Sequence, residues 1–302
     1  MEVFRSSFVR KNFTESDMRY SDLIEIPYSS SAFKGVKREG RGQLKLLIHE
    51  MQFLGMCWNN SEGVDTVYYA GAAPGQHIVI LSKIFSSLKF KLYDVRDFHP
   101  GLRDLENVTC YQKLFSEECV DTEHIGKYIL ISDIRNLSFD AKKTDEENRD
   151  IVTNDWEVQV SWVKKTNPLL ASLKLRINYP VYDQQLPCVS IPQGVICIQP
   201  WTKPGSGETR LIVSKSTSSS TTDQTDDELS PYIYEQKMFF HNMFKRVVPR
   251  YNVPDMKFLD DRYDSAFTYH ILKSLFGDPE AIVNAWDEIC DFLELKEDKT
   301  EE

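Results

Sequence analysis

The chain has 302 residues, of which 41% are hydrophobic and 27% charged, and its net charge is −10. The length allows one large domain or two with a substantial core, and the composition is ordinary for a soluble globular protein. No apolar run approaches the roughly 18 residues of a membrane span, and charges interrupt the N-terminus where a signal peptide needs an apolar segment. The acidic balance argues against a protein coated in nucleic acid. We therefore expect an intracellular protein with no membrane partner.

The first 40 residues lack clear periodicity, which predicts an extended arm. Residues 33–45 carry five Lys or Arg and one Glu in "FKGVKREGRGQLK". This basic stretch is either a solvated loop or a local basic groove on an acidic protein.

Helical and strand-like patterns alternate over the next hundred or so residues. Apolar side chains at helical spacing predict an amphipathic helix in "GQLKLLIHEMQFLGMCW". "DTVYYAG" predicts a strand, "GAAPG" a turn and "QHIVILSKIFSSL" a helix. Three further strands are predicted in "KFKLYD", "VTCYQK" and "KYILISDIR".

A long helix follows, in "KTDEENRDIVTNDWEVQVSWVKKTNP", with an acidic first turn, two lysines near its end and Pro168 to close it. Strands are predicted in "ASLKLRI", "QGVICIQP" and "TRLIVSK", and three helices near the C-terminus. The fold class is thus α/β, with a doubly wound core. The expected parts are an N-terminal arm (1–40), the core (41–216), a polar flexible loop (217–230), a C-terminal helical part packed on the core (231–295) and an acidic tail (296–302).

The six cysteines form no CxxC pair, and the six histidines show no metal-ligand spacing. We expect reduced, buried cysteines, rather than a disulfide framework or a zinc site, and no bound metal. The cysteines are Cys57, Cys110, Cys119, Cys188, Cys197 and Cys290.

The turn between the first strand and its helix is the first candidate site. In open α/β sheets, ligands bind at the carboxyl ends of the strands. Gly71 and Gly75 allow close approach of the backbone, and the following helix offers free N–H groups. Because neither GxGxxG nor GxxxxGK[ST] is present, the turn suits a ligand with a ribose and an amino-acid tail but no pyrophosphate.

Two acidic residues strengthen this interpretation. Asp94 ends the second strand, 23 positions after Gly71, about where a Rossmann-like sheet places a ribose-binding acid. The alternative is a tight turn with a helix-capping Asp. Asp133 ends another strand at the same expected edge, which favours the ligand site.

Seven motifs give the sequence a specific resemblance. "GQLKLL", "YYAGAAPGQHI", "YDVRDFHP", "LISDIR", "ASLKLR", "GETRLIV" and "YEQKMFF" occur in the order and approximate spacing of the poxviral cap-specific mRNA nucleoside-2′-O-methyltransferases. Members of that family also serve as the small, processivity-conferring subunit of the viral poly(A) polymerase. The resemblance extends from about residue 20 to 275 and also covers the wider Rossmann-fold 2′-O-methyltransferases. It implies a relative from another large DNA virus, which would act in the host cytoplasm at sites of viral transcription or be packaged in the virion.

The resemblance implies a catalytic tetrad and a site for S-adenosylmethionine. The tetrad falls on Lys45, Asp133, Lys174 and Glu208. By similarity, the cofactor contacts are Gln43, Tyr69, Gly71, Gly75, His77, Asp94, Arg96, Phe115 and Asp133. Each lysine or acid taken alone is more simply interpreted as a solvated or strand-edge charge. All four together, at the positions that match the family's motifs, favour catalysis.

Elementary chemistry is compatible with those roles. A ribose 2′-hydroxyl is a poor nucleophile at neutral pH and must lose its proton as it attacks the sulfonium methyl. Lys174 is expected to be the general base or the group that orients the hydroxyl. A lysine accepts a proton only if burial or a neighbouring cation, such as Lys45 here, lowers its pKa. Asp133 and Glu208 would hold the lysines and balance the cationic cofactor, and in-line positioning would do much of the rest.

The family stacks the methylated guanine of the cap between two aromatic rings, while carboxylates accept its N–H groups. Tyr179 matches one ring and Glu235 one carboxylate. The second carboxylate departs from the pattern, because Val181 stands there and the nearest acid is Asp183. Tyr28 and Tyr20 in the arm compete for the second ring, with Tyr28 preferred.

These residues favour methyl transfer to the 2′-hydroxyl of the first transcribed nucleotide of capped mRNA. Two alternatives stay open: a non-catalytic processivity subunit bound to the catalytic subunit of a viral poly(A) polymerase, and a 2′-O-methyltransferase of uncapped structured RNA. The first can coexist with catalysis in one protein.

Overall fold

The computed structural model describes residues 10–29, 32, 41–58, 63–136, 144–178, 186–215 and 226–296. The chain divides into two compact units. One, here called the helical unit, consists of residues 1–55, 198–206 and 236–302. The other, the sheet unit, consists of residues 56–197 and 207–235.

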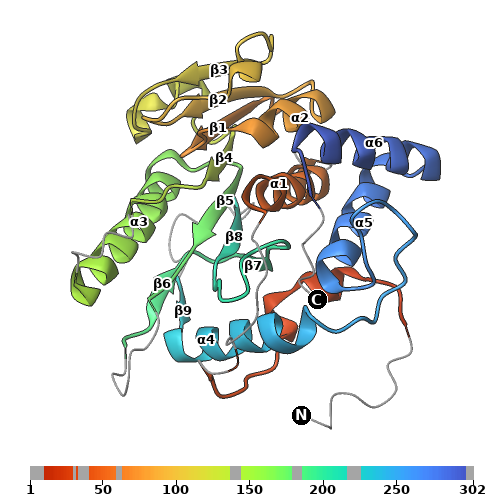
Figure 1. Cartoon of the computed structure of the whole chain (residues 1–302). Coiled ribbons are helices and arrows are strands. Elements are labelled where there is room, and N and C mark those ends of the chain that lie inside the picture. The colour runs from red at the N-terminus through yellow and green to blue at the C-terminus, as the bar shows by residue number, and fades with distance from the viewer. Residues whose placement is uncertain are drawn as a thin grey trace. The chain divides into compact units, whose positions relative to one another are not determined.

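The sheet unit is built around a seven-stranded sheet of order β3-β2-β1-β4-β5-β8-β7 (Figure 1). The first five of these strands are parallel neighbours, and β8 runs antiparallel to β5. This order confirms the Rossmann-like α/β class, since β1 lies at the point where the strand order reverses. The strands are β1 (Thr66–Ala70), β2 (Lys89–Tyr93), β3 (Val108–Tyr111), β4 (Ile129–Ser132), β5 (Leu170–Leu175), β7 (Val195–Ile198) and β8 (Thr209–Ser214).

The central strands β1, β4 and β5 are buried along their whole length, as expected for parallel strands covered on both faces. Helices α2 (Gln76–Ile84) and α3 (Asp145–Thr166) lie on opposite faces. Successive residues of a strand point to opposite faces: Tyr69 contacts His77 of α2, whereas Tyr68 contacts Phe115, which packs on Trp162 of α3.

The ends of α3 follow the signals in the sequence. Thr144 and Glu147 form a reciprocal capping box at its start, and Asn167 ends it in a left-handed conformation, with φ of 46°. Beside the main sheet, β6 (Val189–Ile191) and β9 (Asp227–Leu229) form an antiparallel pair that the sequence did not predict. Short 3-10 helices complete the unit: η5 (Pro100–Leu102), η6 (Glu117–Cys119) and η7 (Thr122–His124).

The helical unit contains most of α1 (Gly42–Trp58), whose bounds match the predicted helix, and the later turns of α4 (Pro231–Phe240). It also contains the π-helical η8 (His241–Lys245), then α5 (Tyr263–Phe276) and α6 (Pro279–Phe292). Two 3-10 turns, η2 (Glu15–Met18) and η3 (Tyr20–Asp22), interrupt the part of the arm that the structure describes. Their buried side chains show that the arm packs as part of this unit instead of extending into solvent.

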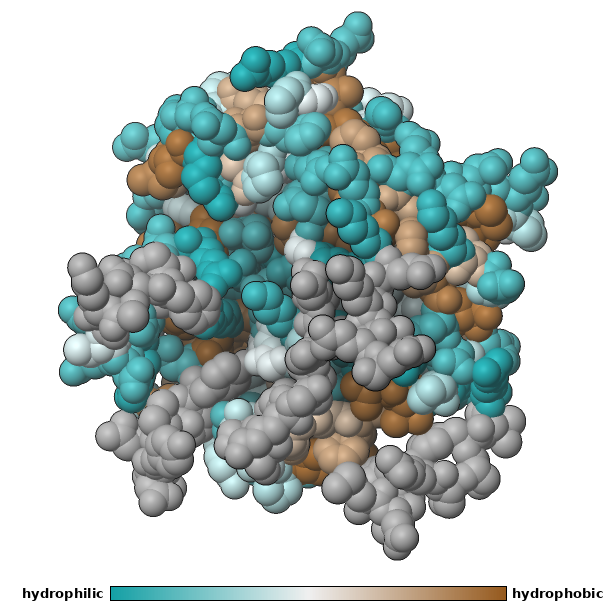
Figure 2. Space-filling model, viewed as in Figure 1, coloured by the Kyte–Doolittle hydropathy of each residue, from teal (hydrophilic) through white to brown (hydrophobic). Residues whose placement is uncertain are grey.

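Hydrophilic side chains cover most of the face shown in Figure 2, with hydrophobic residues in smaller areas between them. Among the described helices, none has a stretch long and apolar enough to cross a membrane. Of the five cysteines that the structure describes, the expectation of burial is confirmed for Cys290 alone: Cys119 and Cys197 are partly exposed, and Cys110 and Cys188 are exposed. Cys110 is exposed because β3 is the edge strand of the sheet.

Candidate functional site

The glycine turn after β1 brings the backbone close to the end of β4. Gly71 has a φ of 77°, and a Cβ there would lie 2.8 Å from both the carbonyl carbon of Asp133 and the amide nitrogen of Ile134. Only glycine tolerates both the angle and the contact. The turn and Asp133 therefore form one tightly packed edge of the sheet.

Gly75 lies at the N-cap of α2, also in a left-handed conformation, with φ of 72°. A Cβ there would lie 3.0 Å from the carbonyl oxygen of Ala72 and 3.1 Å from a methyl carbon of Leu102. A helix start without a side chain leaves the first N–H groups accessible to an anion or a polar ligand.

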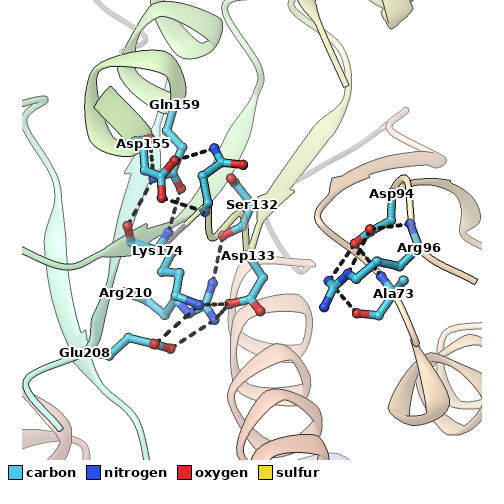
Figure 3. A network of polar contacts seen from close by, with 11 residues as sticks. Ala73, Asp94, Arg96, Ser132, Asp133, Asp155, Gln159, Lys174, Glu208 and Arg210 are labelled. Atoms are coloured by element: carbon cyan, nitrogen blue, oxygen red, sulfur yellow. Dashed lines mark hydrogen bonds and ion pairs between the residues drawn. The ribbon is translucent and has the colours of Figure 1, made fainter. Parts of the chain in front are cut away.

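Asp94 holds this turn with both carboxylate oxygens. It accepts hydrogen bonds from the backbone N–H of Ala73 at 3.0 Å and from that of Arg96 at 2.9 Å. The Arg96 guanidinium donates two more, at 3.0 and 2.8 Å (Figure 3). Although burial opposes the charge, these bonds lower the pKa of Asp94, which keeps it ionised. The Arg96 side chain is 63% exposed, whereas that of Asp94 is 6% exposed.

Three other predicted cofactor residues are buried. Tyr69 and His77 are at most 1% exposed and meet edge to face, at 6.1 Å between ring centroids. Phe115 is 7% exposed and packs edge-on against Trp162 at 4.8 Å and Tyr93 at 5.3 Å.

The structure brings Asp133, Lys174 and Glu208 together, from the ends of β4 and β5 and the start of β8 (Figure 3). Lys174 Nζ lies 3.0 Å from Asp133 Oδ1 and 3.3 Å from Glu208 Oε2. The lysine side chain is 7% exposed and the two acids 16% and 13%. Charges this close and this shielded from water interact strongly.

Arg210 is a fourth member of this cluster that the sequence reasoning missed. Its Nη2 donates to Asp133 Oδ1 and lies 3.6 Å from Glu208 Oε1, while its Nη1 donates to the carbonyl oxygen of Ser132 at 2.8 Å. Burial opposes its charge, but the two carboxylates raise the pKa of Arg210. Glu208 and Arg210 are two residues apart, so the strand period of "GETRLIV" would have placed both on one face.

A pocket adjoins Lys174 within the sheet unit. Residues from α3 form one wall, and Arg135 and Arg176 bring positive charge to the lining. The lining residues are Ile134, Arg135, Val152, Asp155, Trp156, Gln159, Lys174 and Arg176.

Lys45 and Gln43 belong to the helical unit, on the first turns of α1, and both are partly exposed. The backbone N–H of Lys45 donates to the carbonyl oxygen of Arg41 at 2.8 Å, which is the ordinary helix bond. The part of both residues in the site stays a prediction.

Of the two competing arm tyrosines, Tyr28 is 47% exposed and Tyr20 only 7%. Tyr28 packs edge-on against Phe239, at 5.3 Å, which leaves part of its ring accessible. Tyr179 and Asp183 lie outside the described residues. Glu235, on α4, is half-buried, and this burial raises its pKa.

The family described as "Poly A polymerase regulatory subunit" matches residues 15–288. A "Cap-specific mRNA (nucleoside-2'-O-)-methyltransferase" of Fowlpox virus (strain NVSL) is 31% identical over 289 residues, 91% of this chain and 90% of that protein. Proteins of the same name from Myxoma virus (strains Lausanne and Uriarra) are each 29% identical over 248 residues, 78% of this chain and 70% of theirs. Among solved structures, the S-adenosylmethionine-dependent methyltransferase SibL in its apo form covers 71% of this chain, at 12% identity. Its TM-score of 0.26 is too low to support an argument.

Proposed function

Because the chain belongs to the family of poly(A) polymerase regulatory subunits, we propose that it is a cap-specific mRNA 2′-O-methyltransferase. It would transfer methyl from S-adenosylmethionine to the 2′-hydroxyl of the first transcribed nucleotide. The observation that carries the proposal is the meeting of Lys174, Asp133 and Glu208 beside the glycine turn.

The backbone and charge of the turn support S-adenosylmethionine as its ligand. Gly71 lets the turn pack directly against the backbone of Asp133, and Gly75 leaves the start of α2 without a side chain. Asp94 is ionised and hydrogen-bonded, as an acceptor for ribose hydroxyls requires. When bound, the cofactor supplies a methyl group activated by a sulfonium. The remaining contacts we propose are Gln43, Tyr69, His77, Arg96, Phe115 and Asp133.

Lys174 would act on the 2′-hydroxyl of the RNA, as general base or by orienting it. Asp133 and Glu208 hold its Nζ from two sides, and Arg210 holds Asp133 in turn. This arrangement holds the lysine side chain in one direction, which in-line transfer between oxygen, methyl carbon and sulfur demands. Lys45 would complete the set from α1.

Arg135 and Arg176, which line the small pocket beside Lys174, can attract the phosphates of an RNA substrate. For the cap, we propose stacking between Tyr28 and Tyr179, with Glu235 and Asp183 accepting the N–H groups of the methylated base. The exposure of Tyr28 supports its choice over Tyr20.

The family description favours a second, compatible role: binding the catalytic subunit of a poly(A) polymerase and increasing its processivity. If this role is present, purification from infected cells should recover a polymerase together with the chain. Repeated recovery of the chain alone would count against it.

A labelled-methyl assay on three RNAs of one sequence tests the main proposal. The RNAs carry a methylated cap, an unmethylated cap or no cap. Transfer should be fastest to the cap-methylated RNA, with label on the first nucleotide's 2′-oxygen. Equal transfer to uncapped RNA would instead favour a methyltransferase of structured RNA, and no transfer to any would contradict catalysis.

A further inference from the structure

The strand that carries Lys174 loses its neighbour at that residue. β4 pairs with β5 only as far as Ser132 opposite Leu173. The chain then turns toward β1, where the Asp133 N–H donates to the carbonyl oxygen of Ala70 at 2.9 Å. β5 continues to Leu175 with β8 as its only strand partner. The split between β4 and β5 is where the candidate catalytic side chains emerge.

Gln159 of α3 takes the place of the missing strand. Its Oε1 accepts the Lys174 backbone N–H at 3.0 Å, and its Nε2 donates to the Lys174 carbonyl oxygen at 3.2 Å. The same Nε2 donates to the Asp155 carbonyl oxygen at 3.0 Å, which fixes the rotation of the amide. Gln159 is 2% exposed, so these bonds do not compete with water.

One helical turn earlier, Asp155 holds the other side of the split. Its carboxylate accepts from the backbone N–H of Asn136 at 3.0 Å and from the Asn136 side-chain amide at 2.6 Å. Residues four apart lie on one face of a helix. A single face of α3 therefore braces the chain after Asp133 and the peptide of Lys174.

We propose that Gln159 is a positioning residue that sets the backbone, and through it the reach, of Lys174. This inference rests on the proposed function only for its kinetic consequence. A side chain that must meet Asp133, Glu208 and the RNA hydroxyl tolerates little displacement of its Cα. A shift of about 1 Å is enough for a rate loss on the order of a hundredfold. Because Gln159 makes no contact with the glycine turn or with Asp94, its loss lowers kcat and leaves the KM for S-adenosylmethionine unchanged.

The kinetic test compares Gln159→Met with Thr166→Val. Methionine has about the length of the glutamine side chain but no amide group. Thr166 lies on the same helix, is 3% exposed, and bonds to Tyr128 and to the Trp162 carbonyl oxygen, away from Lys174. We expect kcat to fall at least about tenfold in Gln159→Met and less than about twofold in Thr166→Val. Gln159→Asn, whose amide is one carbon shorter, should not rescue kcat. Full activity of Gln159→Met or of Gln159→Asn would overturn the proposal.

Hydrogen exchange at single amides tests the hydrogen bonds between Gln159 and the Lys174 peptide independently of methyl transfer. Since the Lys174 N–H faces Gln159, its pair with Arg210 lacks ladder bonds, and the flanking pairs of Leu173 and Leu175 with β8 carry them. In the wild type, the Lys174 amide should be as protected as those two neighbours. In Gln159→Met, only the Lys174 amide should lose protection. Fast hydrogen exchange of the Lys174 amide in the wild type would overturn the proposal even if a variant fails to fold. If the wild type transfers no methyl but its Lys174 amide is protected, the proposed function is wrong and the positioning role of Gln159 is retained.

Discussion

Two buried lysines, one in each unit, have opposite surroundings. Lys174 and Lys245 are both 7% exposed. Lys174 lies within 3.3 Å of two carboxylates, with Arg210 beside them. Lys245, in η8, donates to the main-chain oxygen of Asp17 at 2.5 Å, and no described carboxylate forms an ion pair with it. Burial lowers the pKa of Lys245 to about 8.

The difference separates the lysine of the proposed active site from a lysine with a structural role. The carboxylate of Asp17 is already engaged by Lys11, Thr14 and Tyr251, so Lys245 joins the arm to the helices through a carbonyl oxygen. Such a lysine fixes a chain segment and holds its proton less tightly than an exposed lysine does. At Lys174, four charged groups face one another where β4 and β5 end. Burial alone therefore does not distinguish Lys174 from Lys245; the two carboxylates beside Lys174 do.

The largest expected effect is that of Lys174→Ala on methyl transfer. Removing the group that accepts or orients the proton should lower the rate by about a hundredfold or more. Cofactor affinity should change little, because the glycine turn and Asp94 are untouched. Labelled-methyl transfer to capped RNA and calorimetric titration with S-adenosylmethionine measure the two quantities.

Lys245→Met is the matched control, since it removes an equally buried lysine from the other unit. It should leave the transfer rate per folded molecule within about twofold, as its ammonium meets no predicted site residue. Unchanged turnover in Lys174→Ala would remove that residue from the mechanism, and an equal loss in both variants would void the comparison.

Arg210→Met should have the next largest effect, and it acts on stability as well as rate. Without the guanidinium, Asp133 loses a partner and the buried cluster gains net negative charge. Breaking a buried pair in this way costs about 3–5 kcal/mol. Urea unfolding measures that loss. Kinetics on the remaining folded protein should show a reduced kcat; a variant as stable and active as the wild type would show that Lys174 alone balances the acids.

Some elements of the fold and some residues of the candidate site could be predicted from the sequence, and others could not. Periodicity and end signals predicted α1, α3 and the sheet strands, because local spacing reports which side of an element is buried. Asp133, Lys174 and Glu208 were found as a set through motif resemblance. Gln159 was missed because its partner depends on where β4 stops, which no local pattern encodes. The strand period could have placed Arg210 on the face of Glu208, but its contact with Asp133 depends on how the strands are ordered in the sheet.

Lys245 should give the protein a measurable pH dependence of stability. Its folded-state pKa of about 8 lies below the ordinary 10.5, so above pH 8 the unfolded state holds the extra proton. Stability should therefore rise with pH between about 8 and 10, by up to about 1.4 kcal/mol per pH unit. Subtracting the unfolding free energies of Lys245→Met isolates this slope from the tyrosines, which titrate at higher pH. A difference that is flat over this range would mean that Lys245 keeps its charge.

The smallest expected effect tests whether the helical unit contributes to the substrate site as well as to structure. Tyr28→Ala removes an aromatic ring that is 47% exposed, and stacking of a cationic base on such a ring contributes about 1–2 kcal/mol. The affinity for a methylated cap analogue should fall about tenfold, measured by fluorescence quenching. Tyr20→Phe is the control, because Tyr20 is buried and Lys237 lies over its ring, 5.0 Å from the centroid. Since phenylalanine preserves that packing, its cap affinity should equal that of the wild type. An equal loss in both variants would show that the effect is not specific to the ring of Tyr28, and an unchanged affinity in Tyr28→Ala would take that ring out of cap recognition.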